Sequence, residues 1–229
     1  MARRGAIALT MVSVAALTGG CATEDKPRIP VGEARPLTPV TLAAPDRSGM
    51  VPFTAWPAAC DLLPEPTVRE VLPAATTIVI NRLAPTGDFA EKELVLPGDA
   101  ECQIGVDLAD AKPAASGKVP VRIQLTLWMV GTPELARKTY DENIAVTAGD
   151  KRTTCPPELV TASGMDACTD DGNAWTFLKN GVAGELRGRA PVLRDGFNFE
   201  GRKKGVSNGK IWHGTVHARL LQAVVTRLP

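Results

Sequence analysis

The sequence lacks the signatures of several functional classes. No run of about 18 apolar residues follows the first 20 positions, which excludes a transmembrane helix there. The formal net charge is only +1 over 229 residues, which argues against a nucleic-acid-binding chain. There is no C-x-x-C motif, no H-E-x-x-H motif and no internal repeat, so neither a zinc site nor a solenoid is indicated. With 44% hydrophobic and 22% charged residues, the composition is that of a globular protein.

Residues 1–20 have the layout of an export signal. Two arginines near the start precede the apolar stretch Ala6–Leu17, which is too short to span a membrane, and small residues follow in Leu17-Thr18-Gly19-Gly20-Cys21. This ending resembles the lipobox of bacterial lipoproteins, in which the cysteine is diacylated and becomes the new N-terminus. We therefore expect a lipoprotein signal peptide, lipidation at Cys21 and anchoring to the outer leaflet of the cytoplasmic membrane. Ordinary cleavage nearby, which gives a soluble secreted protein, is the alternative.

Residues 21–56 are rich in proline. Seven of the 19 prolines lie between residues 22 and 57, among few large apolar residues. Such a segment favours extended, polyproline-like conformations and does not form a packed core. We predict a disordered tether here, which joins the lipid to a single folded domain at residues 57–229.

Four cysteines are left when Cys21 is assigned to the lipid: Cys60, Cys102, Cys155 and Cys168. An exported domain lies in an oxidising compartment, where we expect them to form disulfides. Four cysteines allow three connectivities, of which we favour Cys60–Cys102 with Cys155–Cys168. The second bond closes a short loop, which the chain-entropy model values at about 3 kcal/mol.

Hydrophobic periodicity predicts an α+β domain. Period-two patterns predict strands over residues 76–83, 102–108, 121–130, 175–179 and 182–187, and helical patterns predict helices over 66–72, from 133 onward, and over 211–228. Asn180-Gly181 predicts a type I′ hairpin turn, and Asp195-Gly196 predicts a second hairpin. Because the strands are mostly linked by hairpins, we expect an antiparallel sheet with helices packed on one face.

Four short motifs together resemble a known family. They are Ala59-Cys60-Asp61-Leu62-Leu63, Glu101-Cys102-Gln103-Ile104, Gly172-Asn173-Ala174-Trp175 and a C-terminal helix that ends at Leu228. In this combination the chain resembles actinobacterial secreted lipoproteins that are built on a domain of unknown function. It also has a weaker similarity to the extracellular sensor domains of actinobacterial Ser/Thr kinases. Either resemblance implies an exported, disulfide-bonded α+β module, and neither implies catalytic residues.

Two motifs suggest catalysis or metal binding. Residues 205–209 form a literal G-x-S-x-G around Ser207, but the preceding residues are too polar for the buried strand that a nucleophile elbow requires. A glycine-rich loop that caps a helix explains the motif better. His213 and His217 stand four residues apart on the last helix, a spacing that two metal ligands can share. A helix flank beside Trp212 explains them better.

Four side chains with oxygen atoms cluster around Cys168: Asp166, Asp170, Asp171 and Asn173. Their oxygen atoms are calcium-type ligands, but the spacing is not that of a calcium loop, and we expect a polar turn. We therefore predict no catalytic residue, no metal and no cofactor.

Three features bear on partners. Trp128 and Trp175 are candidate contact residues, although a helix that covers Trp128 is the alternative. Residues 181–229 hold nine Lys/Arg and three Asp/Glu, a basic region that either faces anionic lipids or wall polymers or pairs internally with the acidic part. We expect a non-enzymatic envelope lipoprotein that binds a partner protein, a wall polymer or a small ligand. A sensor or accessory domain for a membrane kinase or transporter is the alternative, and a serine hydrolase that uses Ser207 is a weaker one.

Overall fold

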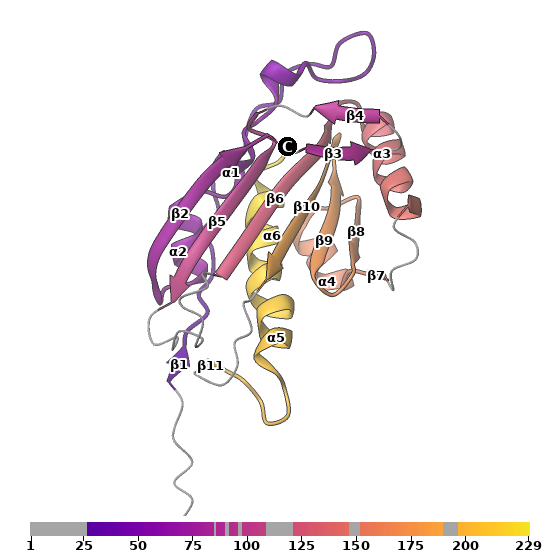
Figure 1. Ribbon diagram of the computed structural model, residues 1–229. Helices are drawn as coiled ribbons and strands as arrows, with labels where there is room; N and C mark the ends of the chain where they lie inside the picture. The colour runs from indigo at the N-terminus through magenta and orange to yellow at the C-terminus, as the bar shows by residue number, and fades with distance from the viewer. Residues whose placement is uncertain are drawn as a thin grey trace, which may run out of the picture.

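The fold is a 7-stranded antiparallel sheet with helices on both faces (Figure 1). The computed structural model describes residues 27–84, 86–89, 92–95, 98–108, 121–146, 152–189 and 197–229. The strands follow the order β2 (Ala75–Leu83), β5 (Glu101–Leu108), β6 (Val121–Val130), β10 (Val182–Arg189), β9 (Ala174–Lys179), β8 (Ala167–Asp170) and β7 (Thr153–Thr154). Two small sheets pair β1 (Arg28–Ile29) with β11 (Asn198–Phe199), and β3 (Thr86–Phe89) with β4 (Lys92–Val95). The α+β class predicted from the sequence is therefore confirmed.

Most helices cover one face of this sheet. They are α1 (Ala59–Leu62), α2 (Glu65–Val71), α4 (Pro157–Ser163) and a C-terminal helix that runs through α5 (Asn208–Ile211), the π-helical turn η2 (Trp212–His217) and α6 (Ala218–Thr226); η1 (Phe53–Ala55) is a short 3-10 turn. The predicted stripe of this last helix, at every fourth residue from Trp212 to Leu228, is buried throughout. Together these helices and the sheet enclose the main core.

Helix α3 (Pro133–Val146) packs on the opposite face. Its Ala136 and Tyr140 contact Leu178 of β9 and Ala183 of β10 in a separate cluster. Val182, next along β10, belongs to the main core, and successive residues of a strand point to opposite faces. The prediction that all helices pack on one face is therefore wrong. Helix α3 begins only three residues after β6 ends, and it folds back over the face that the other helices leave open.

The hairpin predicted at Asn180-Gly181 is confirmed. Asn180 and Gly181 have φ of 41° and 88°, which a type I′ turn requires at both central residues. The register pairs Phe177 with Gly184, and a Cβ at Gly184 would lie 2.9 Å from the ring of Phe177 and 2.6 Å from the carbonyl oxygen of Thr126. The glycine therefore lets the aromatic ring lie directly on the backbone of β10. The second predicted turn, at Asp195-Gly196, lies outside the described residues.

Both favoured disulfides are present. Cys60 of α1 is bonded to Cys102 of β5, with their Cα atoms 4.8 Å apart, and both cysteines lie in the main core. Cys155 is bonded to Cys168 of β8, with a Cα–Cα distance of 5.4 Å. The first bond joins helix α1 to β5, the second strand from one edge of the sheet, and the second fastens the start of α4 to β8.

The N-terminal segment contradicts the predicted tether. The proline-rich composition predicts disorder over residues 21–56, but residues 27–56 run along the domain. The N–H of Gly32 donates to the carbonyl of Val71, and that of Val40 donates to the carbonyl of Arg227, at 3.0 and 2.7 Å. Ile29 and Val51 are only 2% and 1% exposed. Two buried anchors and a few backbone hydrogen bonds thus hold a segment whose composition alone favours disorder.

Residues 21–26, with the predicted lipidation site Cys21, lie outside the described residues. None of the helices that the structure describes is long and apolar enough to cross a bilayer.

Candidate functional site

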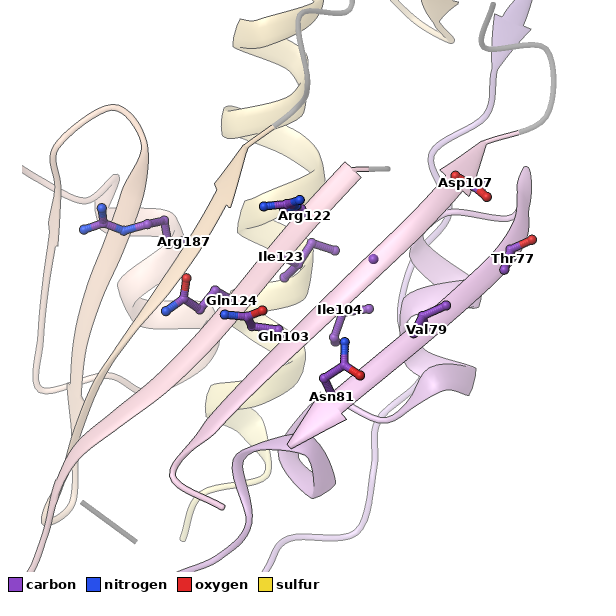
Figure 2. Close-up of a pocket in the computed structure, with 11 residues that line it drawn as sticks. Thr77, Val79, Asn81, Gln103, Ile104, Asp107, Arg122, Ile123, Gln124 and Arg187 are labelled. Carbon is purple, nitrogen blue, oxygen red and sulfur yellow. The ribbon is translucent and has the colours of Figure 1, made fainter. Parts of the chain in front are cut away.

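A polar groove lies on the face of the sheet opposite the C-terminal helix (Figure 2). It has a volume of about 710 Å³ and is formed by the strands β2, β5, β6 and β10. Eleven residues line it: Thr77, Val79, Asn81, Gln103, Ile104, Gly105, Asp107, Arg122, Ile123, Gln124 and Arg187. Helix α3 packs on this same face near Met129, Leu178 and Ala183, beyond the groove. The described part of the chain therefore leaves this half of the face open.

The groove contains a row of side chains at matching positions on four strands. The strand register pairs Asn81 with Gln103, Gln103 with Gln124, and Gln124 with Arg187. Because neighbouring strands are about 4.8 Å apart, this row of three amides and one guanidinium spans about 14 Å across the sheet. Figure 2 shows Gln103 and Gln124 side by side in the middle of the row.

A second row beside the first creates the hollow. Val79 on β2 is paired with Gly105 on β5, and Gly105 is paired with Arg122 on β6. Gly105 has no side chain, so the backbone of β5 forms the floor between the side chains of Val79 and Arg122. A ligand lying on the amide row can therefore approach the sheet closely at this point.

The chemistry of the groove is that of hydrogen bonding and charge. Amide side chains both donate and accept, and guanidinium groups match carboxylate and phosphate oxygens. Arg122 is exposed, whereas the Nε of Arg187 lies 2.8 Å from a carboxylate oxygen of Glu185. Asp107 supplies one carboxylate at the end of the groove. Val79, which is 52% exposed, is the large apolar side chain that the groove presents.

The two tryptophans predicted as contact residues are buried instead. Trp128 is 8% exposed and lies at a β-bulge, where the register of β6 and β10 passes from Met129 to Leu127. Trp175 is 2% exposed, and its ring stacks on that of His213 with 4.8 Å between centroids. The prediction that they contact a ligand is therefore wrong, because both rings are buried, and that of Trp175 packs on the last helix through His213.

A second cluster joins residues that are distant in the sequence. The Nε2 of His213 lies 2.7 Å from Oδ1 of Asp170, which also accepts the N–H of Gly172. Burial alone would raise the pKa of Asp170, but these hydrogen bonds and the charge of His213 outweigh it and lower the pKa. The carboxylate is thus ionised and accepts the hydrogen bond, so the imidazole of His213 donates its Nε2–H.

His217 lies beside this pair and is fully buried. Neither of its ring nitrogens has a hydrogen-bond partner among the described residues. Burial, with a smaller contribution from His213, lowers the pKa of His217 to about 3. The ring fits against Gly188, where a Cβ would lie 1.5 Å from Nε2. His217 is therefore a neutral core residue at physiological pH.

Ser207 begins the C-terminal helix as its N-cap. Its Oγ accepts the backbone N–H of Lys210 at 3.2 Å, which confirms the capping interpretation. Ser207 and His213 line a common hollow of about 630 Å³. However, Nδ1 of His213 is buried without a partner in the described structure, and Nε2 is bonded to Asp170. The described geometry therefore lacks the serine–histidine hydrogen bond of a nucleophilic triad.

The acidic residues around Cys168 form polar turns, as the sequence indicates. Oδ1 of Asp171 accepts the N–H groups of Asn173 and Ala174, and Oδ2 of Asp166 accepts that of Asn180, all at 2.7 Å. In the ranges that the structure describes, no three His, Cys, Asp or Glu side chains gather as they would around a metal ion.

Sequence reasoning missed the groove and the His213–Asp170 pair. The polar half of the alternation in β5 and β6 is visible in Gln103, Asp107, Arg122 and Gln124, so the signal of an exposed polar face was present. What the sequence does not give is the register that aligns these residues, or the packing that brings residue 170 against residue 213.

No family model, no curated protein and no solved structure matches this chain. The resemblance to actinobacterial secreted lipoproteins therefore stays a prediction from its short motifs.

Proposed function

We propose that this chain is a lipid-anchored lipoprotein on the extracytoplasmic face of the cell membrane, and that its domain binds an anionic polymer of the cell wall in the polar groove. The observation that supports binding is the row of Asn81, Gln103, Gln124 and Arg187 across four strands. The membrane anchor is supported by the signal-like N-terminus and Cys21, and the exported location by the two disulfides.

The side chains of the groove favour a polar polymer over other ligands. Pockets for small molecules are lined mainly by apolar and aromatic residues, and the cores of protein interfaces are rich in aromatic residues. Among the described residues that line the groove, none is aromatic and one is a large, exposed apolar residue. Amides match the hydroxyl and amide groups of a wall polymer, and Arg122 and Arg187 match its carboxylate or phosphate groups.

Substitutions in the groove should weaken polymer binding. Arg122→Glu replaces an attractive charge with a repulsive one, and Gln103→Ala with Gln124→Ala removes the centre of the amide row. Since a hydrogen bond to a charged group contributes about 1.5–3 kcal/mol, we expect Arg122→Glu to weaken binding at least about tenfold. Isothermal titration with soluble oligosaccharides that carry carboxylate or phosphate groups measures this effect.

Arg47→Glu is the matched control, because Arg47 is exposed and does not line the groove. It makes the same change in net charge, and we expect near-native affinity. If the two arginine variants lose affinity equally, or if neither groove variant loses any, binding occurs elsewhere and the proposed site is rejected.

Substitution of Cys21 tests the anchor. Cys21→Ala removes the thiol that would carry the lipid, and a chain without two acyl groups lacks stable membrane attachment. We expect the chain to move from the membrane fraction to the soluble extracytoplasmic fraction, with the acyl mass gone from its N-terminal peptide. Thr23→Ala is the control and should stay in the membrane. A Cys21→Ala chain that stays fully membrane-bound would contradict lipidation at this residue.

A further inference from the structure

We infer that a basic loop beside the N-terminal strand rests on the anionic headgroups of the membrane. We define this basic loop by the exposed side chains of Arg202, Lys203 and Lys204, together with that of Lys210 in the adjoining helix α5. The inference rests on the proposed lipidation of Cys21 and adds a second contact with the same membrane, which orients the domain.

The chain enters the domain beside this loop. β1 pairs in parallel with β11, so that Arg28 lies opposite Asn198 and Ile29 opposite Phe199. The N–H of Asn198 donates to the carbonyl of Pro27, and the N–H of Glu200 donates to that of Ile29, at 2.9 and 2.8 Å. Ile29 and Phe199 are both buried, so this junction is fixed to the core. The basic loop begins three residues after Phe199.

The distance to the lipid is limited by the length of the chain. Only residues 22–26 separate Cys21 from Pro27, and an extended chain covers at most about 3.6 Å per residue. The junction therefore lies within about 22 Å of the acylated cysteine. Figure 1 shows β1, β11 and α5 together at one end of the molecule, with α3 and β4 at the other. The lipid thus holds the basic end against the membrane.

The loop is shaped to present its charges. Arg202 donates to the side chain of Asn198 and to the carbonyl of Val206, and the side-chain amide of Asn208 bonds to the backbone of Phe197 at 2.7 Å. Lys203, Lys204 and Lys210 make no ion pair with any described residue.

The charge at this end matches an anionic surface. The exposed Arg28 adds to the loop, Glu200 opposes it, and the connecting segment contains Glu24, Asp25 and Lys26. Cationic side chains near an anionic leaflet each strengthen binding, and the attraction decays within a Debye length. Since the loop is held within reach of the headgroups, its positive charges lie where the attraction of the anionic leaflet is strong. The strands of the sheet run away from this end (Figure 1), so the polar groove faces sideways into the envelope.

Vesicle binding by a chain without lipid tests the contact separately from the anchor. The chain of residues 22–229 should bind vesicles of phosphatidylcholine and phosphatidylglycerol in equal parts, should not bind phosphatidylcholine alone, and should be released by salt. Lys203→Glu with Lys204→Glu should weaken this binding at least about tenfold. The control, Arg47→Glu with Lys138→Glu, makes the same charge change on exposed residues elsewhere. Its affinity for the anionic vesicles should stay within about twofold of that of the native chain.

The outcomes separate the two proposals. Three results would overturn the membrane contact. The chain could bind neutral and anionic vesicles equally, or both double variants could lose the same affinity for vesicles. The basic loop could also bind soluble wall polymer in preference to vesicles. The anchor is tested independently by Cys21→Ala in cells, because that result does not depend on Lys203 or Lys204.

Discussion

Lowering the pH from 6.5 to 4 should remove a large part of the free energy of unfolding of this domain. The imidazole of His217 is buried without hydrogen-bond partners among the described residues, and its pKa is about 3 in the folded protein against 6.5 for an ordinary histidine. Between these two values the unfolded chain binds one more proton than the folded chain. The free energy of unfolding therefore rises with pH across this window, and it falls as the pH is lowered through it.

The expected effect is large for one side chain. Each pKa unit corresponds to 1.36 kcal/mol, so the slope is about 1.4 kcal/mol per pH unit and the loss between pH 6.5 and 4 is about 3 kcal/mol. A domain of this kind has only about 5–15 kcal/mol of stability. Below pH 3.8, the ordinary pKa of an aspartate, Asp170 adds to the loss, because its lowered pKa favours the folded state only while the carboxylate is ionised.

Urea unfolding at a series of pH values measures the slope. His217→Leu, an apolar side chain of similar size, should remove about 1.4 kcal/mol per pH unit from the slope between pH 4.5 and 6. His213→Leu is the control, because it changes the neighbouring imidazole and leaves His217 in place, and it should keep most of the slope. An unchanged slope in His217→Leu would show that His217 is not the group responsible.

Removal of the Cys60–Cys102 disulfide should destabilise the domain more than removal of Cys155–Cys168. The first bond joins residues 42 apart in sequence, and the second joins residues 13 apart. In the chain-entropy model these loops correspond to about 4 and about 3 kcal/mol. The second bond also has support, since the N–H of Cys155 donates to the carbonyl of Cys168 at 3.2 Å.

Two double variants, with both cysteines of one bond changed to alanine, allow a direct comparison. Both are measured by urea unfolding without reductant, and peptide mapping confirms the remaining bond. We expect the Cys60/Cys102 variant to show the lower midpoint. A lower midpoint for the Cys155/Cys168 variant would mean that loop length does not control the contribution of these disulfides.

Local patterns in the sequence predict most of the sheet. The alternation along β6 and the Asn180-Gly181 turn are signals within one or two elements, and both are confirmed. The position of α3 is not such a signal. Its apolar stripe predicts that Ala136 and Tyr140 are buried, but not on which side of the sheet, because that choice depends on contacts with Leu178 and Ala183. The short strands β1 and β11 likewise depend on a partner that is distant in sequence, since they pair with each other.

In the candidate site, too, local patterns predict which residues are polar, whereas contacts between distant residues decide where they lie. The polar identities of Gln103, Arg122 and Gln124 follow from alternation, but their alignment in one row depends on the register of three strand pairs. The prediction for Trp128 is wrong for a related reason, since this residue lies at a bulge that interrupts the alternation. The basic loop is visible in the sequence as charge, whereas its place beside β1 requires the parallel pairing with β11.

The contact between the two ends of the chain has a consequence for biogenesis. The guanidinium of Arg227 donates to the carbonyl of Thr38 across 189 residues of sequence, and β1 has no partner until β11 is available. A chain that emerges N-terminus first therefore presents its first strand and its extended N-terminal segment long before their partners appear. We expect the central hairpins to fold early and the N-terminal segment to dock last, so the step that attaches the domain to its anchor segment is also the step that completes the fold.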